Sequence, residues 1–178
     1  MSRLLGRFRG TRLPRPEDPG DAKVLSDIER FGFHAKHVRP WHHPEHAAQN
    51  AQLAPHPIYD IGLSYTAGLS HTWRHPELAI VTDMDAERAH DILWAAVALI
   101  RDEGARFAAG DTSDRVLEFA AVAFGPVSSN RRKELLTFAD WVARRKRFDA
   151  LQILLPDRHG RFPDHPSYAG PPQPLLGS

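Results

Sequence analysis

A twenty-residue amphipathic stretch, DAERAHDILWAAVALIRDEG at residues 85–104, limits the fold more than any other part of the sequence. Its apolar residues recur three and four positions apart, acidic residues come early, and Gly104 can end a helix there. A helix with one wide apolar face must bury that face, and the other apolar segments of the chain are short and strand-like. The stretch therefore predicts a helix packed against a sheet.

The remaining segments supply that sheet and two further helices. A helix is expected over 21–32, with Asp21 as its N-cap and Gly32 at its end, and an extended segment follows over 33–38. Further along, the patterns predict strands over 58–69, 77–82, 115–127 and 150–156, and an amphipathic helix over 130–147. This order predicts a single α+β domain, with a mixed, mostly antiparallel sheet packed by two to three helices.

The two ends of the chain differ in composition from its middle. Residues 1–20 carry five arginines and three prolines, so we expect a flexible basic arm there. Residues 164–178 are rich in proline and glycine, and we expect this tail to trail or wrap over the surface. The folded domain is therefore expected over residues 21–163, with one long loop over 39–57.

Composition also excludes several classes of protein. Of 178 residues, 42% are hydrophobic and 25% are charged, which is typical of a globular protein, and the net charge is only +1. The absence of cysteine excludes disulfides, thiolate ligands and a cysteine nucleophile. No apolar run approaches the roughly 20 residues that span a bilayer, and the N-terminus lacks the apolar core of a signal peptide. We therefore expect a cytoplasmic protein without a membrane segment.

The stretch SYTAGLSHTWRHPELAIV, residues 64–81, holds the densest group of reactive side chains. His71, His75 and Glu77 are candidates for catalytic proton transfer or for binding a divalent metal, since two imidazoles and one carboxylate suit iron or zinc. The alternative is structural: Pro76 favours an extended His75 that bonds backbone in a turn, while Glu77 caps a chain end. The spacing leaves both interpretations open.

A second stretch, LQILLPDRHGRFP at residues 151–163, adds polar residues near the C-terminus. We expect both stretches to meet in one polar pocket, with ligand contacts from Tyr65, Thr66, Gln152, Asp157 and Arg161. The guanidinium of Arg161 can bind a carboxylate or phosphate of a small anionic ligand. An ion pair from Arg161 to Glu77 or Asp157 is the simpler alternative.

Together the two stretches resemble the bacterial domain-of-unknown-function family 4262, whose pattern is a Gly-aromatic start, a YTxGL…HPEL segment and a late QxxxPDxxGRFP segment. The matching residues are Gly32 and Phe33; Tyr65, Thr66, Gly68 and Leu69; His75, Pro76, Glu77 and Leu78; and Gln152, Pro156, Asp157, Gly160, Arg161, Phe162 and Pro163. The chain departs from the pattern at Asp164, where the family has a tryptophan, and in its longer, histidine-rich loop over 39–57. The resemblance implies an α+β domain over about 27–163 and no particular activity.

The loop over 39–57 contains an unusual group of imidazole, aromatic and acidic side chains: Trp41, His42, His43, Glu45, His46 and His56. A flexible cluster can capture a metal adventitiously, but it lacks the second layer of groups that orients true ligands. We expect a solvated loop or, alternatively, a lid over residues 65–77 that supplies an imidazole for proton transfer.

Charge is distributed unevenly along the chain. Residues 130–148 hold seven basic and two acidic side chains, whereas residues 77–118 hold ten acidic and four basic ones. The basic segment could contact nucleic acid, but no base-reading motif or aromatic platform accompanies it, so a nucleic-acid partner is not expected. The same polarity could serve a protein partner or a second copy of the chain.

These features leave three hypotheses. The first is a small-molecule-binding domain or modest enzyme, with a divalent metal as the one cofactor that the residues indicate. The second is a non-enzymatic interaction protein, such as an immunity or accessory factor, and the third is a nucleic-acid-associated protein. The chain contains no phosphate-binding glycine loop, nucleophile elbow, HExxH or dinucleotide fingerprint, which argues against the common hydrolase, kinase and dehydrogenase classes.

Overall fold

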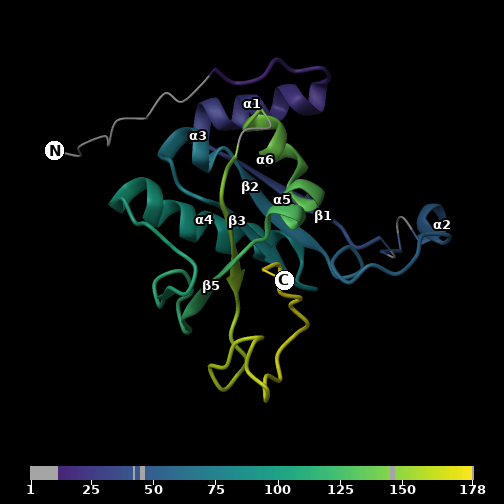
Figure 1. Ribbon diagram of the computed structural model, residues 1–178, viewed down its shortest axis with the longest axis vertical. Helices are drawn as coiled ribbons and strands as arrows, with labels where there is room; N and C mark the ends of the chain where they lie inside the picture. The colour runs from purple at the N-terminus through teal and green to yellow at the C-terminus, as the bar shows by residue number, and fades with distance from the viewer. Residues whose placement is uncertain (1–11, 42, 45–46, 145–146, 178) are drawn as a thin grey trace.

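A six-stranded mixed sheet forms the middle of the computed structural model, which describes residues 12–41, 43–44, 47–144 and 147–177 (Figure 1). The strands are β1 (His34–Val38), β2 (Leu63–Ala67), β3 (Glu77–Val81), β4 (Thr112–Ser113), β5 (Val122–Pro126) and β6 (Ala150–Leu154). Their order across the sheet is β1-β2-β3-β6-β5-β4, and all neighbours are antiparallel except β3 and β6. The predicted α+β class and mostly antiparallel sheet are confirmed.

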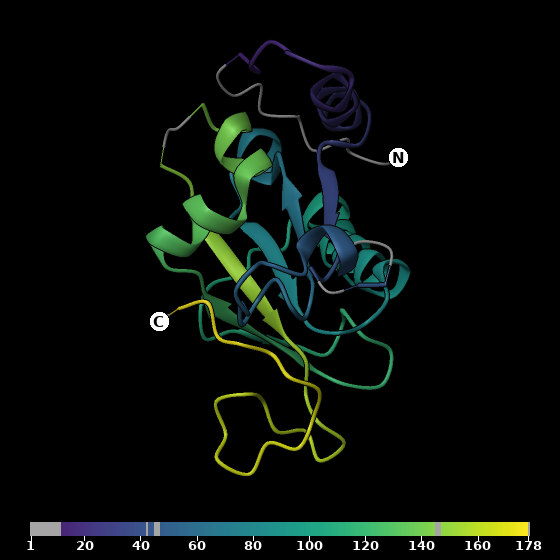
Figure 2. The ribbon, with the colours of Figure 1, turned by 90° about the vertical axis from the view of Figure 1, so that its right-hand side faces the viewer.

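Helices cover both faces of this sheet (Figure 2). They are α1 (Pro19–Phe31), α2 (Ala47–Asn50), α3 (Leu69–Trp73), α4 (Ala86–Glu103), α5 (Ser129–Leu135) and α6 (Thr137–Val142). On one face, α4 buries Leu93 and Val97 against Leu78 and Ile80 of β3. On the other face, α1, α5 and α6 enclose a second core that includes Tyr65. None of the helices within the described ranges is long and apolar enough to cross a membrane.

The two long helices end where the sequence provides caps. Gly32 and Gly104 take the left-handed conformation at the ends of α1 and α4, as predicted. The predicted N-cap of α1 is wrong, because Asp18 accepts the hydrogen bond from the N–H of Asp21. Pro19 starts the helix instead, since the first helical residue needs no N–H partner.

Residues 130–147 do not form the single helix that their pattern predicts. Leu136 leaves the helical conformation, with φ −98° and ψ 54°, and separates α5 from α6. The break allows Leu135 and Leu136 to be buried together, and it places the N–H of Phe138 3.3 Å from the hydroxyl of Tyr65. Tertiary packing here outweighs the local helical pattern.

The strands are shorter than their sequence patterns, and the chain ends contact the core. Ladder pairing uses only 63–67 of the predicted strand 58–69, and α3 forms in the turn between β2 and β3. The C-terminal segment wraps over the sheet alongside β6 and buries Leu176 (Figure 2). At the other end Leu13 packs against the same core, while residues 1–11 lie outside the described residues.

Candidate functional site

Glu77, the first residue of β3, is buried, and its carboxylate accepts five hydrogen bonds of 2.8–3.2 Å. The donors are the hydroxyl of Thr66, the N–H groups of Gly68, Leu69 and Ser70, and the hydroxyl of Ser70. Gly68 makes this wrapping of the chain feasible, because its φ of +114° lies in the left-handed region that glycine tolerates. The carboxylate therefore fixes the start of α3 to the start of β3.

The electrostatics of this carboxylate explain its role. Burial raises the pKa of Glu77, and the hydrogen bonds from Ser70, Thr66 and Leu69 oppose that rise by stabilising the charged form. All five donors are neutral, and together they occupy the lone pairs that a metal or a substrate proton would need. Glu77 thus joins the start of α3 to the start of β3, which agrees with the structural interpretation of this residue and not with the catalytic or metal-binding one.

His75 is buried beside Glu77, and its two ring nitrogens are both bonded to backbone. Nδ1 donates to the carbonyl of Pro76 at 2.7 Å, and Nε2 accepts from the N–H of Phe107 at 3.1 Å. This pattern requires a neutral ring, and burial lowers the pKa of His75 accordingly. The ring also packs edge-on against Phe107, with 5.7 Å between centroids. His75 therefore anchors the loop before β4 to the start of β3.

The predicted metal site of His71, His75 and Glu77 is not formed. Within the ranges that the structure describes, no group of three His, Asp or Glu side chains is placed to hold a metal ion. His71 lies partly exposed on α3, where burial lowers its pKa, but His75 and Glu77 direct their polar atoms at backbone. The same bonds leave neither His75 nor Glu77 free for the predicted proton transfer.

In the second stretch, residues 151–163, Asp157 is the carboxylate that gathers hydrogen bonds from the surrounding turn, as Glu77 does in the first. Its Oδ1 accepts from the N–H groups of His159 and Arg161, and its Oδ2 accepts from the guanidinium of Arg161 and the N–H of Ala169. Burial tends to raise the pKa of Asp157, but these hydrogen bonds outweigh it and hold that pKa well below its usual range. Arg161 thus pairs with Asp157, which is the simpler of its two predicted roles.

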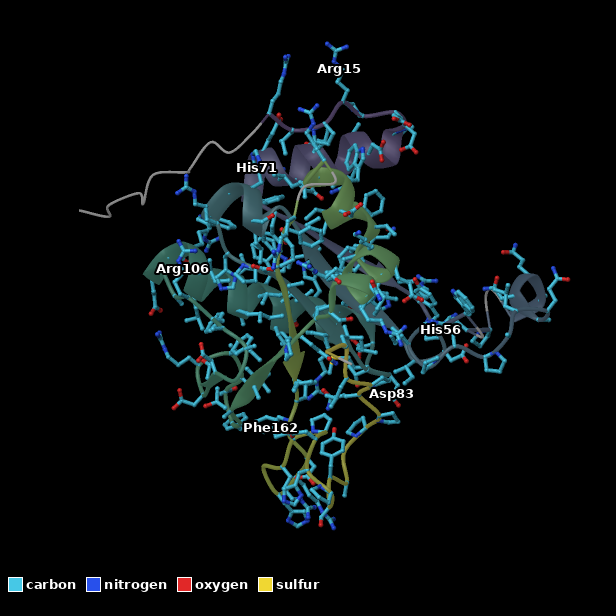
Figure 3. The ribbon with its side chains drawn as sticks, viewed as in Figure 1. Arg15, His56, His71, Asp83, Arg106 and Phe162 are labelled. Carbon is cyan, nitrogen blue, oxygen red and sulfur yellow. The ribbon has the colours of Figure 1, made fainter. Side chains whose placement is uncertain are left out.

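The two stretches pair as β3 and β6, but their polar turns, near His71 and near Phe162, lie at opposite ends of these strands (Figure 3). In the parallel pair β3–β6, Glu77 is opposite Ala150, so Asp157 stands beyond the far end of β6. Seven residues of extended chain cover about 20 Å. The expected single pocket that combines His75 and Glu77 with Asp157 and Arg161 is therefore not formed.

The other predicted ligand contacts are also buried. Tyr65 is 1% exposed, its hydroxyl accepts from the N–H of Phe138, and burial raises its pKa. The hydroxyl of Thr66 accepts from the N–H of Leu78 at 2.9 Å while it donates to Glu77. Both side chains therefore support the core.

Gln152 holds the C-terminal segment on the sheet. Its side-chain amide donates to the carbonyl of Pro174 and accepts from the N–H of Leu176, each at 2.9 Å. In return, the amide of Gln173 accepts from the N–H of Leu155 at 2.8 Å and donates to the carbonyl of Leu155 at 2.9 Å. The C-terminal segment is therefore held beside β6 by hydrogen bonds of two side-chain amides, and not by the backbone hydrogen bonds of a further strand.

A cavity of about 520 Å³ lies beside this segment and is called the β5–β6 cavity below. Its walls come from β5, β6, the start of β4, the turn after Arg161 and the C-terminal segment, and they include Gly110, Gly125, Leu154, Phe162, Leu175 and Gly177. Thr112, Gln152 and Asp164 add polar groups. Apolar walls with a few polar groups are typical of small-molecule sites of this size.

A family model matches residues 27–169, which is most of the chain. The chain belongs to the family DUF4262. The family is described as a domain of unknown function, which establishes membership without an activity. No curated protein and no solved structure is significantly similar to the chain. The match includes both stretches of sequence discussed above but ends before the segment that Gln152 binds.

The end of the long loop near His56 contacts α5 in this DUF4262 protein (Figure 3), whereas α2 projects away from the sheet (Figure 1). Tyr59 stacks on Trp41 at 4.6 Å and donates to the carbonyl of Glu134, and Nε2 of His56 lies 3.3 Å from a carboxylate oxygen of Glu134. The described part is therefore not a lid over His75 and Glu77. The predicted residues His42, Glu45 and His46 lie outside the described residues.

Sequence reasoning missed most residues of the β5–β6 cavity. Phe162 lies at the end of the late stretch and Asp164 just after it, but only their three-dimensional placement brings them to β5. Leu175 and Leu176 were a usable signal, since apolar side chains in a Pro- and Gly-rich tail indicate that the tail docks.

Proposed function

We propose that this DUF4262 protein binds a small, largely apolar molecule with a cationic or hydrogen-bond-donating group in the β5–β6 cavity. The observation that carries the proposal is the combined shape and chemistry of that cavity. It encloses about 520 Å³ between the sheet and the docked C-terminal segment, a size that suits a drug-sized ligand.

The apolar part of the ligand would contact Leu154, Phe162 and Leu175. Gly110 has open space where a side chain would stand, which leaves room for a flat ligand, whereas Leu154 covers the corresponding position at Gly125. Leu175 is 42% exposed, and its coverage by a ligand would remove that apolar surface from water.

The polar part of the ligand is inferred from the charges at the cavity. Among the described residues that line it, Asp164 alone is charged. Arg161 nearby is paired with Asp157, and the amide of Gln152 is committed to the C-terminal segment. A ligand amine or hydroxyl could therefore pair with Asp164, which revises the expectation of an anionic ligand held by Arg161.

The nucleic-acid alternative receives less support from the basic segment than its sequence suggests. Arg131 pairs with Glu134 at 3.0 Å, and Arg132 pairs with Asp149 at 3.2 Å and lies over the ring of Phe148. These contacts reduce the positive charge offered to a phosphate backbone. Ligand binding is therefore preferred here.

Titration with tryptamine, followed by amide chemical shifts, tests the proposal. Tryptamine combines a flat apolar body with an amine, and tryptophol is the matched neutral probe. Shifts are expected at Gly110 and Gly125, and Ala123→Phe, which fills the cavity from β5, should weaken binding more than about 10-fold.

Asp164→Asn should reduce the preference for tryptamine over tryptophol by only about 2- to 5-fold, because an exposed charge pair contributes little. Asp91→Asn, an exposed change on α4, is the matched control and should bind like the wild type. Shifts that map elsewhere, or binding that survives Ala123→Phe unchanged, would contradict the proposal.

A further inference from the structure

His37 and Ser64 form a direct cross-strand pair between β1 and β2, on the face of the sheet that α4 covers. Nδ1 of His37 lies 2.7 Å from Oγ of Ser64. A serine hydroxyl within hydrogen-bond reach of an imidazole is the arrangement that activates a serine nucleophile. Cross-strand polar pairs also occur as structural contacts, so the surroundings of this pair decide what it can do.

The pair opens on a notch of about 280 Å³ between β1 and the first turns of α4. Ala35 and Leu93 provide apolar walls, and His90 and Glu87 of α4 line the notch opposite His37. Ser64 is only 4% exposed, so its accessible surface is confined to this space. The notch thus combines a hydroxyl with two imidazoles and one carboxylate.

The charges around His37 favour a neutral imidazole. Burial lowers the pKa of His37, Arg39 and Lys36 on the same segment lower it further, and Asp85 before α4 opposes them. Glu87 and His90 of α4 are the other titratable groups that line the notch. A neutral ring at pH 7 can accept the proton of Ser64.

We propose that this notch is a second site, in which Ser64 is a nucleophile for small esters and His37 is its general base. Oγ of Ser64 would bond to the acyl carbon while its proton moves to Nδ1 of His37. The alcohol would then leave as the ester C–O bond breaks, and it would take that proton. Water would release the acid from the acyl-serine by the reverse route.

The site is independent of the β5–β6 cavity, because it lies at the β1 edge of the sheet and under α4. Ala86 and Glu87, the first residues of α4, form its far wall. The carboxylate of Glu87 in this wall offsets the partial positive charge that the first turn of α4 would otherwise offer to an attacked ester. The position of the pair, not this helix end, carries the proposal.

A fluorophosphonate probe on the full-length protein tests the nucleophile, because such a probe bonds to activated serines as fluoride leaves. One adduct per chain is expected, mapped to Ser64 by peptide mass spectrometry, and none in Ser64→Ala. His37→Gln keeps a polar group of similar size and should slow labelling about 100-fold, which is typical for loss of a general base. Labelling of the wild type should also slow as acid protonates His37.

Ser26→Ala, at an exposed position on α1, is the matched control and should label like the wild type. Circular dichroism shows whether each variant is folded. If Ser64→Ala fails to fold, the adduct mapped in the wild type and the labelling rate of His37→Gln still test whether Ser64 is a nucleophile that His37 activates. Absence of an adduct, an adduct on another serine, or equal rates in His37→Gln and wild type would each overturn the proposal.

Discussion

Glu77 and Asp157 perform the same task at opposite ends of two adjacent parallel strands. Each carboxylate gathers the backbone of a turn, but Glu77 is bonded by five neutral donors in the core, whereas Asp157 also pairs with the cationic, partly exposed Arg161. The Glu77 end is packed closed by α3. The Asp157 end carries the C-terminal segment and lies next to the β5–β6 cavity. The Glu77 end is thus held rigid and closed, whereas the Asp157 end is held by similar bonds but borders the β5–β6 cavity.

Replacement of Glu77 should have the largest effect on stability. Glu77→Ala leaves at least two buried N–H groups without an acceptor, at about 1–3 kcal/mol each, so we expect a loss of about 3 kcal/mol or more in the free energy of unfolding. Urea unfolding measures this loss. Asp91→Ala, exposed on α4, is the control and should change it by less than about 0.5 kcal/mol.

Glu77→Gln separates charge from shape at the same position. The amide keeps one acceptor oxygen but presents its NH₂ group to donors, so it should destabilise the protein nearly as much as Glu77→Ala. Wild-type stability of Glu77→Gln would show that the ionised carboxylate is not required and that the two ends differ less than proposed.

Asp157 should give the next largest effect, and this effect should depend on pH. Its pKa is lower in the folded chain than its ordinary value of 3.8, so its contribution is fully present above that value and is lost as the pH falls from there towards the lower pKa of the folded chain. Asp157→Asn should therefore destabilise at pH 7 and flatten the loss of stability below about pH 4. Unfolding midpoints from pH 7 down to pH 3 measure this, and an unchanged acid slope would show that Asp157 does not hold the turn.

The sequence predicts much of the architecture because strong local patterns agree with the tertiary fold. The spacing in 85–104 predicts α4, and the apolar runs predict β3 and β6. Local patterns fail at Leu136, where the helix breaks so that the Tyr65 hydroxyl can bond the N–H of Phe138. There, burial of two adjacent leucines outweighs helical periodicity.

The position of the candidate site was harder to predict than the fold, because it depends on which strands pair and which of their ends lie together. Residue type alone identifies both carboxylates, and the structural alternative for each agrees with the bonds observed. Their separation follows from the parallel pairing of β3 with β6, which joins segments about 70 residues apart and has no local signal. The β5–β6 cavity depends on where the C-terminal segment docks, and the expectation that this tail trails or wraps over the surface does not place it beside β5 and β6.

Gln152 tests whether the open end depends on the C-terminal segment, with a smaller expected effect. Gln152→Ala removes both hydrogen bonds to Pro174 and Leu176, so we expect a loss of about 1–3 kcal/mol in the free energy of unfolding. Proteolysis within 164–177 should also be faster than in the wild type. Gln52→Ala, exposed in the long loop, is the matched control. Unchanged proteolysis would show that the buried Leu176 and the amide of Gln173 hold the segment without Gln152.

His75 offers the smallest and most specific test of the closed end. Its pKa is lowered in the folded chain, so the unfolded chain binds a proton more readily and stability should fall as the pH decreases through about 6.5. His71 and His37 have pKa values shifted in the same direction, so His75→Gln should remove only part of this slope. Urea midpoints between pH 8 and pH 5 measure it. Asp157 changes stability with pH only below about pH 4, so it does not contribute to a slope between pH 8 and pH 5. If that slope survives His75→Gln in full, the neutral ring is not what joins β3 to the loop before β4.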